Sequence, residues 1–188
     1  MSARVSAKAK ILQAAARVVE REGAAHLTLD AVADEAQLSK GGLLYHFPNK
    51  RSLLTGMLEH LLQRAENKSA SAQVKLGQDA PKVAALIAAQ QDQSPDEWAM
   101  SRAILAAAAE DPSLLDPARD MLERWFGEAD AEGRYATLLL MAVEGLRFME
   151  MLKLVTLSPA QRERLYGQMV ELAHKPNHNS DTGLNANT

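Results

Sequence analysis

Residues 28–54, TLDAVADEAQLSKGGLLYHFPNKRSLL, decide the fold of this chain. Their apolar side chains recur at helical spacing up to Ala36 and again after Ser39, with an interruption at Gln37 and Leu38. The second pattern ends at Pro48, which cannot continue a helix. Thr28, Ser39 and Asn49 each stand before a helical pattern, where a side-chain oxygen can accept hydrogen bonds from the first free amides. The stretch therefore predicts two short helices joined by a tight turn, followed by the start of a third helix.

The second short helix, residues 40–46, contains two adjacent glycines, Gly41 and Gly42. Each should destabilise a helix by about 1 kcal/mol relative to alanine, but a glycine also lets the backbone approach another molecule closely. Polar side chains that suit phosphate oxygens or base edges surround them: Ser39, Lys40, Tyr45, His46 and Lys50. The pattern favours a DNA-reading helix, and the simpler alternative is a helical corner with a solvated polar face.

The stretch resembles the helix-turn-helix of the tetracycline-repressor family, whose pattern reads roughly T-x-x-x-[IV]-A-x-x-A-[GV]-[VL]-S-x-G-x-L-Y-x-[HY]-F-x-[NS]-K-x-x-L. The matching residues are Thr28, Val32, Ala33, Ala36, Leu38, Ser39, Gly41, Leu43, His46, Phe47, Asn49, Lys50 and Leu53. Two positions depart from the pattern. Gln37 replaces the usual turn glycine and must tolerate its backbone conformation, and Leu44 replaces the usual tyrosine, with Tyr45 next along the chain.

The resemblance implies a set of DNA contacts in this chain: Thr28, Ser39, Lys40, Gly41, Gly42, Leu44, Tyr45, His46 and Lys50. We expect Thr28, Tyr45, His46 and Lys50 to hold the DNA backbone. Ser39, Lys40 and the glycine surface would face the bases. The resemblance also implies an all-α fold of about nine helices, with an N-terminal three-helix helix-turn-helix domain and a C-terminal helical ligand-binding and dimerisation domain.

The charge distribution agrees with that division. The net charge of −3 separates into +2 for residues 1–66 and −5 for the rest, so the basic excess lies where phosphate would be met. We therefore predict a helix-turn-helix domain at 1–66, a ligand-binding and dimerisation domain at 67–174, and a disordered polar tail at 175–188. The absence of cysteine, of a signal core and of a membrane span favours a cytoplasmic protein.

Helical spacing and capping residues predict the remaining helices. The expected ranges are 7–22, 50–66 with a fraying end and loop to 78, 82–91, 95–110, 113 or 117 to 128, 136–155, and 159–173. Residues 136–155 are apolar on every side, so the helix must be buried on every side. In a domain of this size, burial by a second copy is expected, and the resemblance places a homodimer interface in the last two helices.

The resemblance also implies a small-molecule pocket in the second domain. The candidates are Trp98, Met100, Trp125, Phe126, Glu144, Arg147 and Phe148. Aromatic and methionine side chains at helical spacing are more often ordinary core than pocket wall. Glu144 lies in an apolar stretch and needs a partner, which is either Arg147 three residues along or a ligand.

These features predict a ligand-responsive DNA-binding transcriptional regulator, a repressor that a small molecule releases from a near-palindromic operator. The alternative is a helical ligand- or partner-binding protein with weak or lost DNA binding, for which the departures at Gln37 and Leu44 leave room. A helical enzyme ranks third, because no catalytic constellation or phosphate loop is evident. We expect no cofactor, no metal site and no membrane partner.

Overall fold

The computed structural model describes residues 6–133 and 135–175, and this part of the chain contains only helices. The α-helices are α1 (Ala7–Glu22), α2 (Leu29–Ala36), α3 (Lys40–His46), α4 (Lys50–Leu76), α5 (Lys82–Gln90), α6 (Pro95–Ala108), α7 (Asp116–Glu132), α8 (Ala136–Met151) and α9 (Pro159–Ala173). Two 3-10 helices, η1 (Ala24–His26) and η2 (Pro112–Leu115), join them. The all-α prediction is confirmed; except for Lys175, the predicted disordered tail lies outside the described residues.

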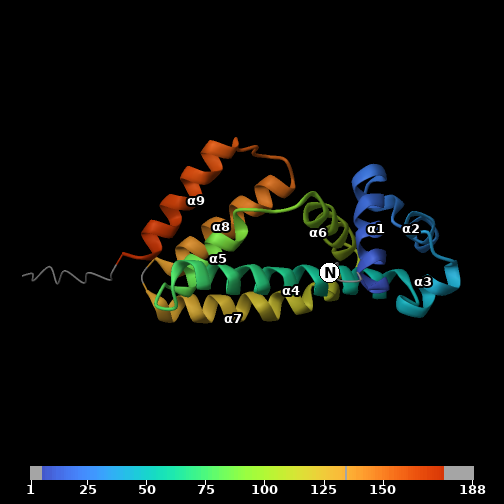
Figure 1. Cartoon of the computed structure of the whole chain (residues 1–188), viewed down its shortest axis with the longest axis horizontal. Coiled ribbons are helices and arrows are strands. Elements are labelled where there is room, and N and C mark those ends of the chain that lie inside the picture. Colours follow the sequence, from blue (N-terminus) through green and yellow to red (C-terminus); the bar gives the residue numbers. More distant parts are fainter. Residues whose placement is uncertain (1–5, 134, 176–188) are drawn as a thin grey trace, which may run out of the picture.

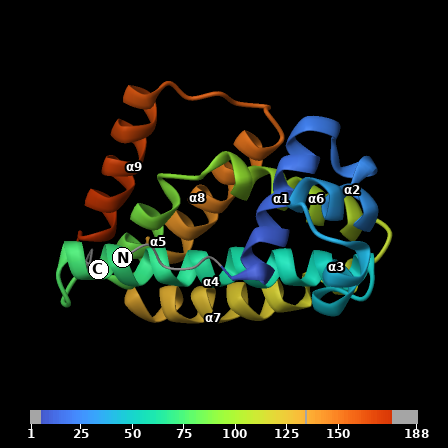
Figure 2. The same ribbon diagram turned by 45° about the vertical axis from the view of Figure 1, so that its right-hand side comes forward.

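The long helix α4 connects the two ends of the molecule (Figure 1). Helices α1, α2 and α3 gather around its first turns, whereas α5, α8 and α9 lie toward its other end and α7 runs alongside it (Figures 1 and 2). The N-terminal core combines α1, α2, α3, the start of α4, and α6. The C-terminal core combines α5, α7, α8 and α9, and Leu62 of α4 packs against both cores.

Helices α1 to α4 begin where the sequence predicts. The side chains of Ser6, Thr28, Ser39 and Asn49 each accept a hydrogen bond from the backbone amide three residues along. Gln37 ends α2 in the left-handed conformation, at φ 55° and ψ 44°, as expected for a residue at the position of a turn glycine. The helix-turn-helix geometry is thus formed without glycine at its turn.

Three predicted helix ends are wrong. Helix α4 continues to Leu76 instead of fraying from residue 66, because later turns are anchored by buried Ala72 and by Lys68, which binds α6. Helix α7 continues to Glu132, past the predicted end at residue 128. Helix α8 ends at Met151 instead of residue 155, since the chain turns away through Lys153 at φ 57°.

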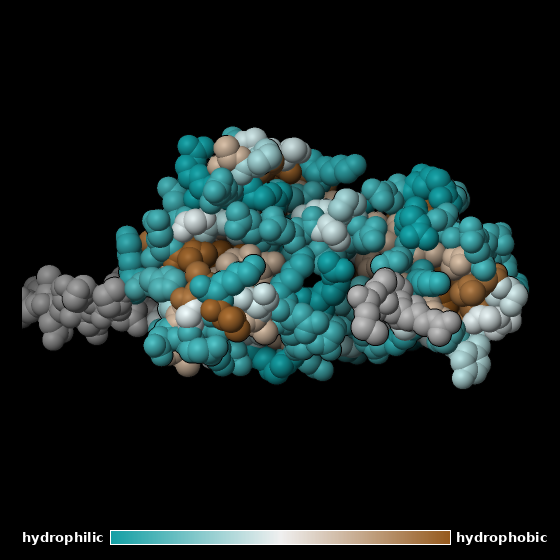
Figure 3. All heavy atoms as spheres, viewed as in Figure 1, coloured by the Kyte–Doolittle hydropathy of each residue, from teal (hydrophilic) through white to brown (hydrophobic). Residues whose placement is uncertain are grey.

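The surface seen in Figure 3 is mostly hydrophilic. Apolar patches lie over the left end, where α5 packs beside the end of α4, and over the right end, formed by α1, α2 and α3. Within the described ranges, no helix combines the length and the apolar character that crossing a membrane requires.

Candidate nucleic-acid interface and ligand cavity

Helix α3 is held from one side and open on the other. Leu43 and Phe47 are buried in the N-terminal core, which fixes the helix against α1 and α4. Tyr45 points away from that core and is 85% exposed, and its ring meets the edge of His46 at 5.1 Å between centroids. Leu44, at the family's tyrosine position, is half-buried. Tyr45 is therefore the aromatic side chain that α3 presents to solvent.

Two hydroxyl groups beside α3 are positioned by their capping bonds. Thr28 Oγ1 accepts from the Ala31 amide at 3.1 Å, and Ser39 Oγ accepts from the Gly42 amide at 3.1 Å. Both residues are exposed, and neither hydroxyl donates to a residue in the described ranges. Each capping bond leaves the hydroxyl proton available to an acceptor such as a phosphate oxygen.

The two lysines of this surface differ in their partners. Lys40 Nζ lies 2.8 Å from Asp30 Oδ1, but both side chains are more than 60% exposed, so the pair is weak and a phosphate could replace it. Lys50 is exposed at the start of α4 and has no ion pair within the described residues. Lys40 and Lys50 can therefore bind an anion such as a phosphate without breaking a strong ion pair.

The glycines near this end serve different purposes. A Cβ atom at Gly41 would meet nothing within 4 Å, so internal packing does not require glycine there. At Gly42 a Cβ atom would lie 3.3 Å from Ser39 Oγ, and at Gly56 it would lie 2.5 Å from the Phe47 ring. Gly56 thus allows α4 to pack on Phe47, whereas Gly41 keeps an outer surface bare.

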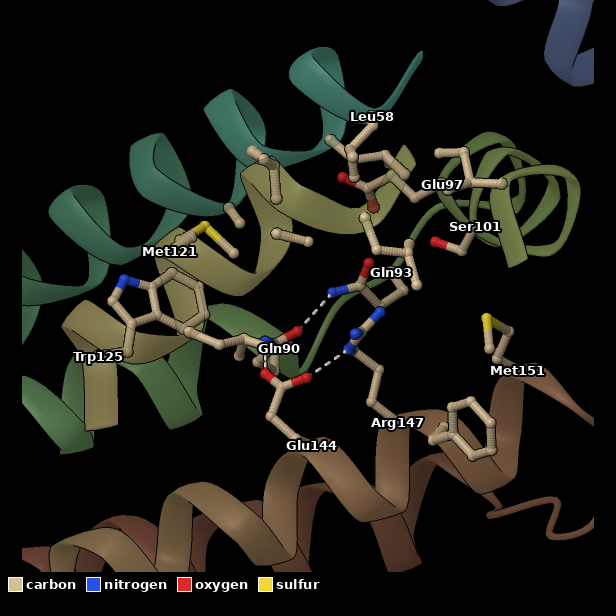
Figure 4. Close-up of a pocket in the computed structure, with 18 of the residues that line it drawn as sticks. Leu58, Gln90, Gln93, Glu97, Ser101, Met121, Trp125, Glu144, Arg147 and Met151 are labelled. Carbon is tan, nitrogen blue, oxygen red and sulfur yellow. Dashed lines mark hydrogen bonds and ion pairs between the residues drawn. The ribbon is translucent and has the colours of Figure 1, made fainter. Parts of the chain in front are cut away.

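A cavity of about 340 Å³ lies between α4, α5, α6, α7 and α8 (Figure 4). Most of its wall is apolar, with Leu58, Met121, Trp125 and Met151 among the lining side chains. The polar residues of the wall are Lys68, Gln90, Gln93, Glu97, Ser101, Arg119, Glu144 and Arg147. An apolar cavity with a few convergent polar groups is typical of a small-molecule site.

The structure brings four of the predicted pocket residues to this wall: Trp125, Glu144, Arg147 and Phe148. It does not bring Trp98, Met100 or Phe126 there. Met100 is 2% exposed in the N-terminal core, because the cavity-facing residues of α6 follow the register of Glu97 and Ser101 and place Met100 on the side of α1. Phe126 packs against the C-terminal core, and Trp98 is half-buried away from the cavity.

Glu97 is a cavity residue that the sequence did not reveal. It is 4% exposed and accepts hydrogen bonds from Arg64 Nε at 2.8 Å, from Lys68 Nζ at 2.8 Å and from the Ser94 amide at 2.7 Å. Burial by itself raises the pKa of Glu97, but the bonds from Lys68 and Ser94, with the charges of Lys68 and Arg64, outweigh it and hold the pKa below its usual value. The only sequence signal was its place in the capping box of α6.

Glu144 pairs with Arg147, as the sequence-based alternative to a ligand contact proposed. Arg147 Nε donates to Glu144 Oε2 at 3.0 Å, and Gln90 Nε2 donates to Glu144 Oε1 at 2.6 Å (Figure 4). Gln93 donates in turn to Gln90 Oε1 at 3.1 Å. The carboxylate is therefore compensated inside the protein, although it remains on the cavity wall.

The described ranges contain no group of three or more residues of metal-ligand type placed to hold a metal ion. The chemistry that the two regions offer is binding: an exposed cationic and hydroxyl-bearing helix at one end, and an internal apolar cavity with charged groups at the other.

Comparisons with known proteins agree with this division. Residues 11–57 match the family model "Bacterial regulatory proteins, tetR family", and residues 80–174 match the model "Tetracyclin repressor-like, C-terminal domain". No curated protein matches the sequence.

Several solved structures share the fold. A transcriptional regulator from Rhodococcus sp. Rha1 superposes with a TM-score of 0.70 at 20% identity, covering 89% of this chain and 96% of the other. A regulator from Saccharomonospora viridis in complex with choline gives 0.68 at 21% identity, over 88% and 95% of the two chains. The multidrug binding protein EbrR complexed with ethidium gives 0.58 at 21% identity, over 87% and 98%.

Proposed function

The chain belongs to the tetR family of bacterial regulatory proteins, and from this premise we propose that it is a ligand-responsive repressor. Helix α3 enters the major groove of duplex DNA, and a small molecule in the cavity releases the protein from its operator. The observation that carries the proposal is the construction of α3. Its buried face is anchored by Leu43, and its outer face presents Lys40, Gly41 and Tyr45 without obstruction.

In the proposed complex, some of these residues contact the phosphate backbone and the others contact the bases. Thr28, Tyr45, His46 and Lys50 hold the phosphate backbone, and Ser39, Lys40, Gly41 and Gly42 face the base edges. Leu44, at the position of the family's tyrosine, is half-buried, so it contributes an apolar contact at most. The exposed Tyr45 beside it supplies a different phosphate contact.

Two copies are needed to read a near-palindromic operator, with recognition helices about 34–36 Å apart. Helix α8 supports a homodimer, because one of its faces is apolar and exposed. Its members are Leu138, Met141, Ala142, Gly145, Phe148 and Met149, and Leu138 is 64% exposed. A contiguous exposed apolar face typically marks a protein interface. Leu172 of α9, 37% exposed, adds apolar surface on the other helix of the predicted interface.

The long helix α4 supplies the connection between ligand and DNA. Lys50 stands at its first turn beside α3, while Leu58 and Lys68 of the same helix line the cavity. A molecule in the cavity that binds the released arrangement more tightly than the DNA-bound one shifts the equilibrium toward release. Because we propose that it binds operator DNA, we place the protein in the cytoplasm.

The test is a titration of fluorescent duplex DNA across a range of salt concentrations, which needs no knowledge of the operator because phosphate contacts are independent of sequence. Affinity should fall steeply with salt, and Lys50→Ala should reduce the slope of log K against log salt by about one unit. Lys75→Ala, an exposed lysine at the far end of the same helix, is the matched control and should leave the slope unchanged.

A flat salt dependence of the wild-type protein would contradict the proposal. It would favour the alternative of a helical ligand- or partner-binding protein that does not bind DNA.

A further inference from the structure

The cavity holds two carboxylates, and both are already compensated by the protein. Glu97 accepts from Arg64, Lys68 and the Ser94 amide, and Glu144 accepts from Gln90 and Arg147, so each of the four oxygen atoms has a donor. An acid in this state gives little attraction to a cationic ligand. The charge of Glu144 is already balanced by Arg147, so a cation placed against it would also meet the neighbouring guanidinium.

Arg147 has donors to spare. Only its Nε is engaged, and its two terminal amino groups have no partner within residues 6–133 and 135–175. Figure 4 shows the guanidinium reaching from α8 into the space below Gln93, with the Ser101 hydroxyl approaching the same space from α6. The hydroxyl of Ser101 has no hydrogen bond to any described residue. The charged part of the unused polar capacity is therefore donor capacity, beside the neutral acceptor Gln93 Oε1.

The formal charges of the wall point the same way. Arg119 is neutralised by Asp116, whereas Glu97 is paired with both Lys68 and Arg64. With Arg147 and Glu144 balancing each other, the cavity wall and its direct partners carry one net positive charge. A guanidinium can bind an oxyanion through two parallel hydrogen bonds while its Nε remains on Glu144. An anion would therefore gain contacts here without breaking any that the protein already makes.

We propose that the effector of this cavity is a small amphipathic molecule with an apolar body and one carboxylate-type anionic group, which Arg147 and Ser101 hold. This inference rests on the proposed function, because it assigns a chemical class to the ligand of the same cavity. The apolar body lies against Leu58, Met121 and Trp125, and the volume of about 340 Å³ limits the molecule to the small end of the range of about 300–1,000 Å³ for ligand sites.

The assignment differs from the ligands found in proteins of similar fold. Two of those proteins form complexes with choline and with ethidium, which are cations. At 21% identity those structures share the fold alone with this chain, so the polar groups of its own cavity decide its ligand.

The experiment compares three probes of equal chain length by isothermal titration calorimetry of the full chain: decanoate, decanol and decyltrimethylammonium. Decanoate should bind tightest and the ammonium compound weakest. Arg147→Met should weaken decanoate binding by about ten- to a hundredfold, the loss expected for hydrogen bonds to a charged group, and change decanol binding by less than about threefold. Arg124→Met, which removes a surface arginine of α7 outside the cavity, should change neither affinity.

A second variant, Glu144→Gln, keeps Arg147 and tests the proposal even if Arg147→Met does not fold. It should leave decanoate binding unchanged or tighter, because the guanidinium loses its competing carboxylate. Ammonium binding tighter than decanoate binding, loss of ammonium binding in Glu144→Gln, or equal decanoate affinity in wild type and Arg147→Met would each overturn the inference, as would no binding of decanoate.

A parallel DNA-binding assay separates this inference from the proposed function. If the ammonium compound binds and displaces the duplex, the ligand-responsive regulator stands and the anionic assignment falls. If decanoate binds through Arg147 but leaves DNA affinity unchanged, the anionic assignment stands and the proposed release mechanism falls.

Discussion

Local side-chain caps begin every α-helix of the DNA-reading end but only some helices of the ligand-binding end. Each helix from α1 to α4 starts at a residue whose own side chain caps the amide three positions along. In the ligand-binding end, Ser94 and Ser158 also cap α6 and α9 locally, but α5 and α7 start after Pro81 and Leu115, whose side chains carry no acceptor. Helix α5 uses Glu132 instead, which accepts from the amides of Lys82 at 2.6 Å and Val83 at 2.9 Å across about fifty residues of chain.

The two ends therefore differ in how far apart in the sequence the residues that specify their helices lie. The helix starts of the DNA-reading end are specified by contacts between near neighbours in sequence, although the core beneath them is completed by α6. The ligand-binding end depends on contacts between residues far apart in the chain, so its cavity exists only once several helices have assembled. Five predictions test this contrast, from the largest expected change in stability to the smallest.

Glu97→Ala should have the largest effect, because it leaves Lys68 and Arg64 without the carboxylate that joins α4 to α6. Removing one member of a buried charge network costs about 3 kcal/mol of unfolding free energy. The matched control is Glu59→Ala, whose carboxylate makes an exposed pair with Lys8 at 3.6 Å and should change stability by less than about 1 kcal/mol. Urea denaturation at neutral pH measures both, and equal losses would contradict the prediction.

The same residue predicts a pH dependence. The pKa of Glu97 is lower in the folded protein than its usual value of 4.5, so the stability it contributes is complete above that value and disappears as pH falls through the folded pKa. Wild-type protein should therefore lose stability below about pH 4.5 more steeply than Glu97→Gln, which cannot take up this proton. If the urea midpoints of wild type and Glu97→Gln fell equally as the pH was lowered, the Glu97 carboxylate would not be held by Lys68 and Arg64.

Gly56→Ala should destabilise the protein by about 1–3 kcal/mol, since the new Cβ atom would lie 2.5 Å from the Phe47 ring and must displace it. Phe47 ends the reading helix, so DNA affinity should fall together with stability. Thermal unfolding and duplex binding, measured on the same preparation, test the two effects. An unchanged melting temperature would mean that this contact does not position α3.

Glu132→Ala tests the long-range cap directly, and should cost about 1 kcal/mol through loss of two bonds to the first amides of α5. Glu128→Ala removes only a side-chain pair with Lys82 at 3.5 Å and should change stability by less than about 0.5 kcal/mol. Ser39→Ala, the local counterpart at α3, should also cost about 1 kcal/mol. If only the local cap proved costly, the distant carboxylate would not be the cap of α5.

Gly41→Ala should have the smallest effect on folding and the opposite sign. Alanine is the better helix former and meets nothing within 4 Å, so the variant should gain up to about 1 kcal/mol of stability while binding DNA more weakly. Gly127→Ala in α7 has equally open surroundings and should gain stability without changing DNA affinity. Unimpaired DNA binding by Gly41→Ala would remove this glycine from the interface.

The contrast also explains what the sequence could predict. Ser6, Thr28, Ser39 and Asn49 identified the starts of four helices because capping is local, and the pattern of the turn required the left-handed backbone found at Gln37. Nothing local could show that residues after 66 continue α4, because the contact that holds Lys68 there comes from α6.

The cavity was harder to predict for the same reason. Trp125, Glu144, Arg147 and Phe148 reach its wall, but the choice between Met100 and its neighbour Ser101 depended on how α6 is rotated against α1. That rotation is set by packing between distant helices and is absent from the spacing of residues in α6 itself.

In the proposed regulator, two copies present their α3 helices to successive turns of duplex DNA, and the distance between the two helices changes when the cavity is filled. Because the chain contains no cysteine, Asp34→Cys gives one spin label per chain, on an exposed position of α2 that is outside the proposed DNA contacts. Pulsed electron paramagnetic resonance should give one sharp inter-label distance on DNA, consistent with reading helices about 34–36 Å apart, and a different distance with an effector that releases the duplex. Absence of dipolar coupling would contradict the dimer on DNA, and the same distance in both states would contradict the proposed change in helix separation.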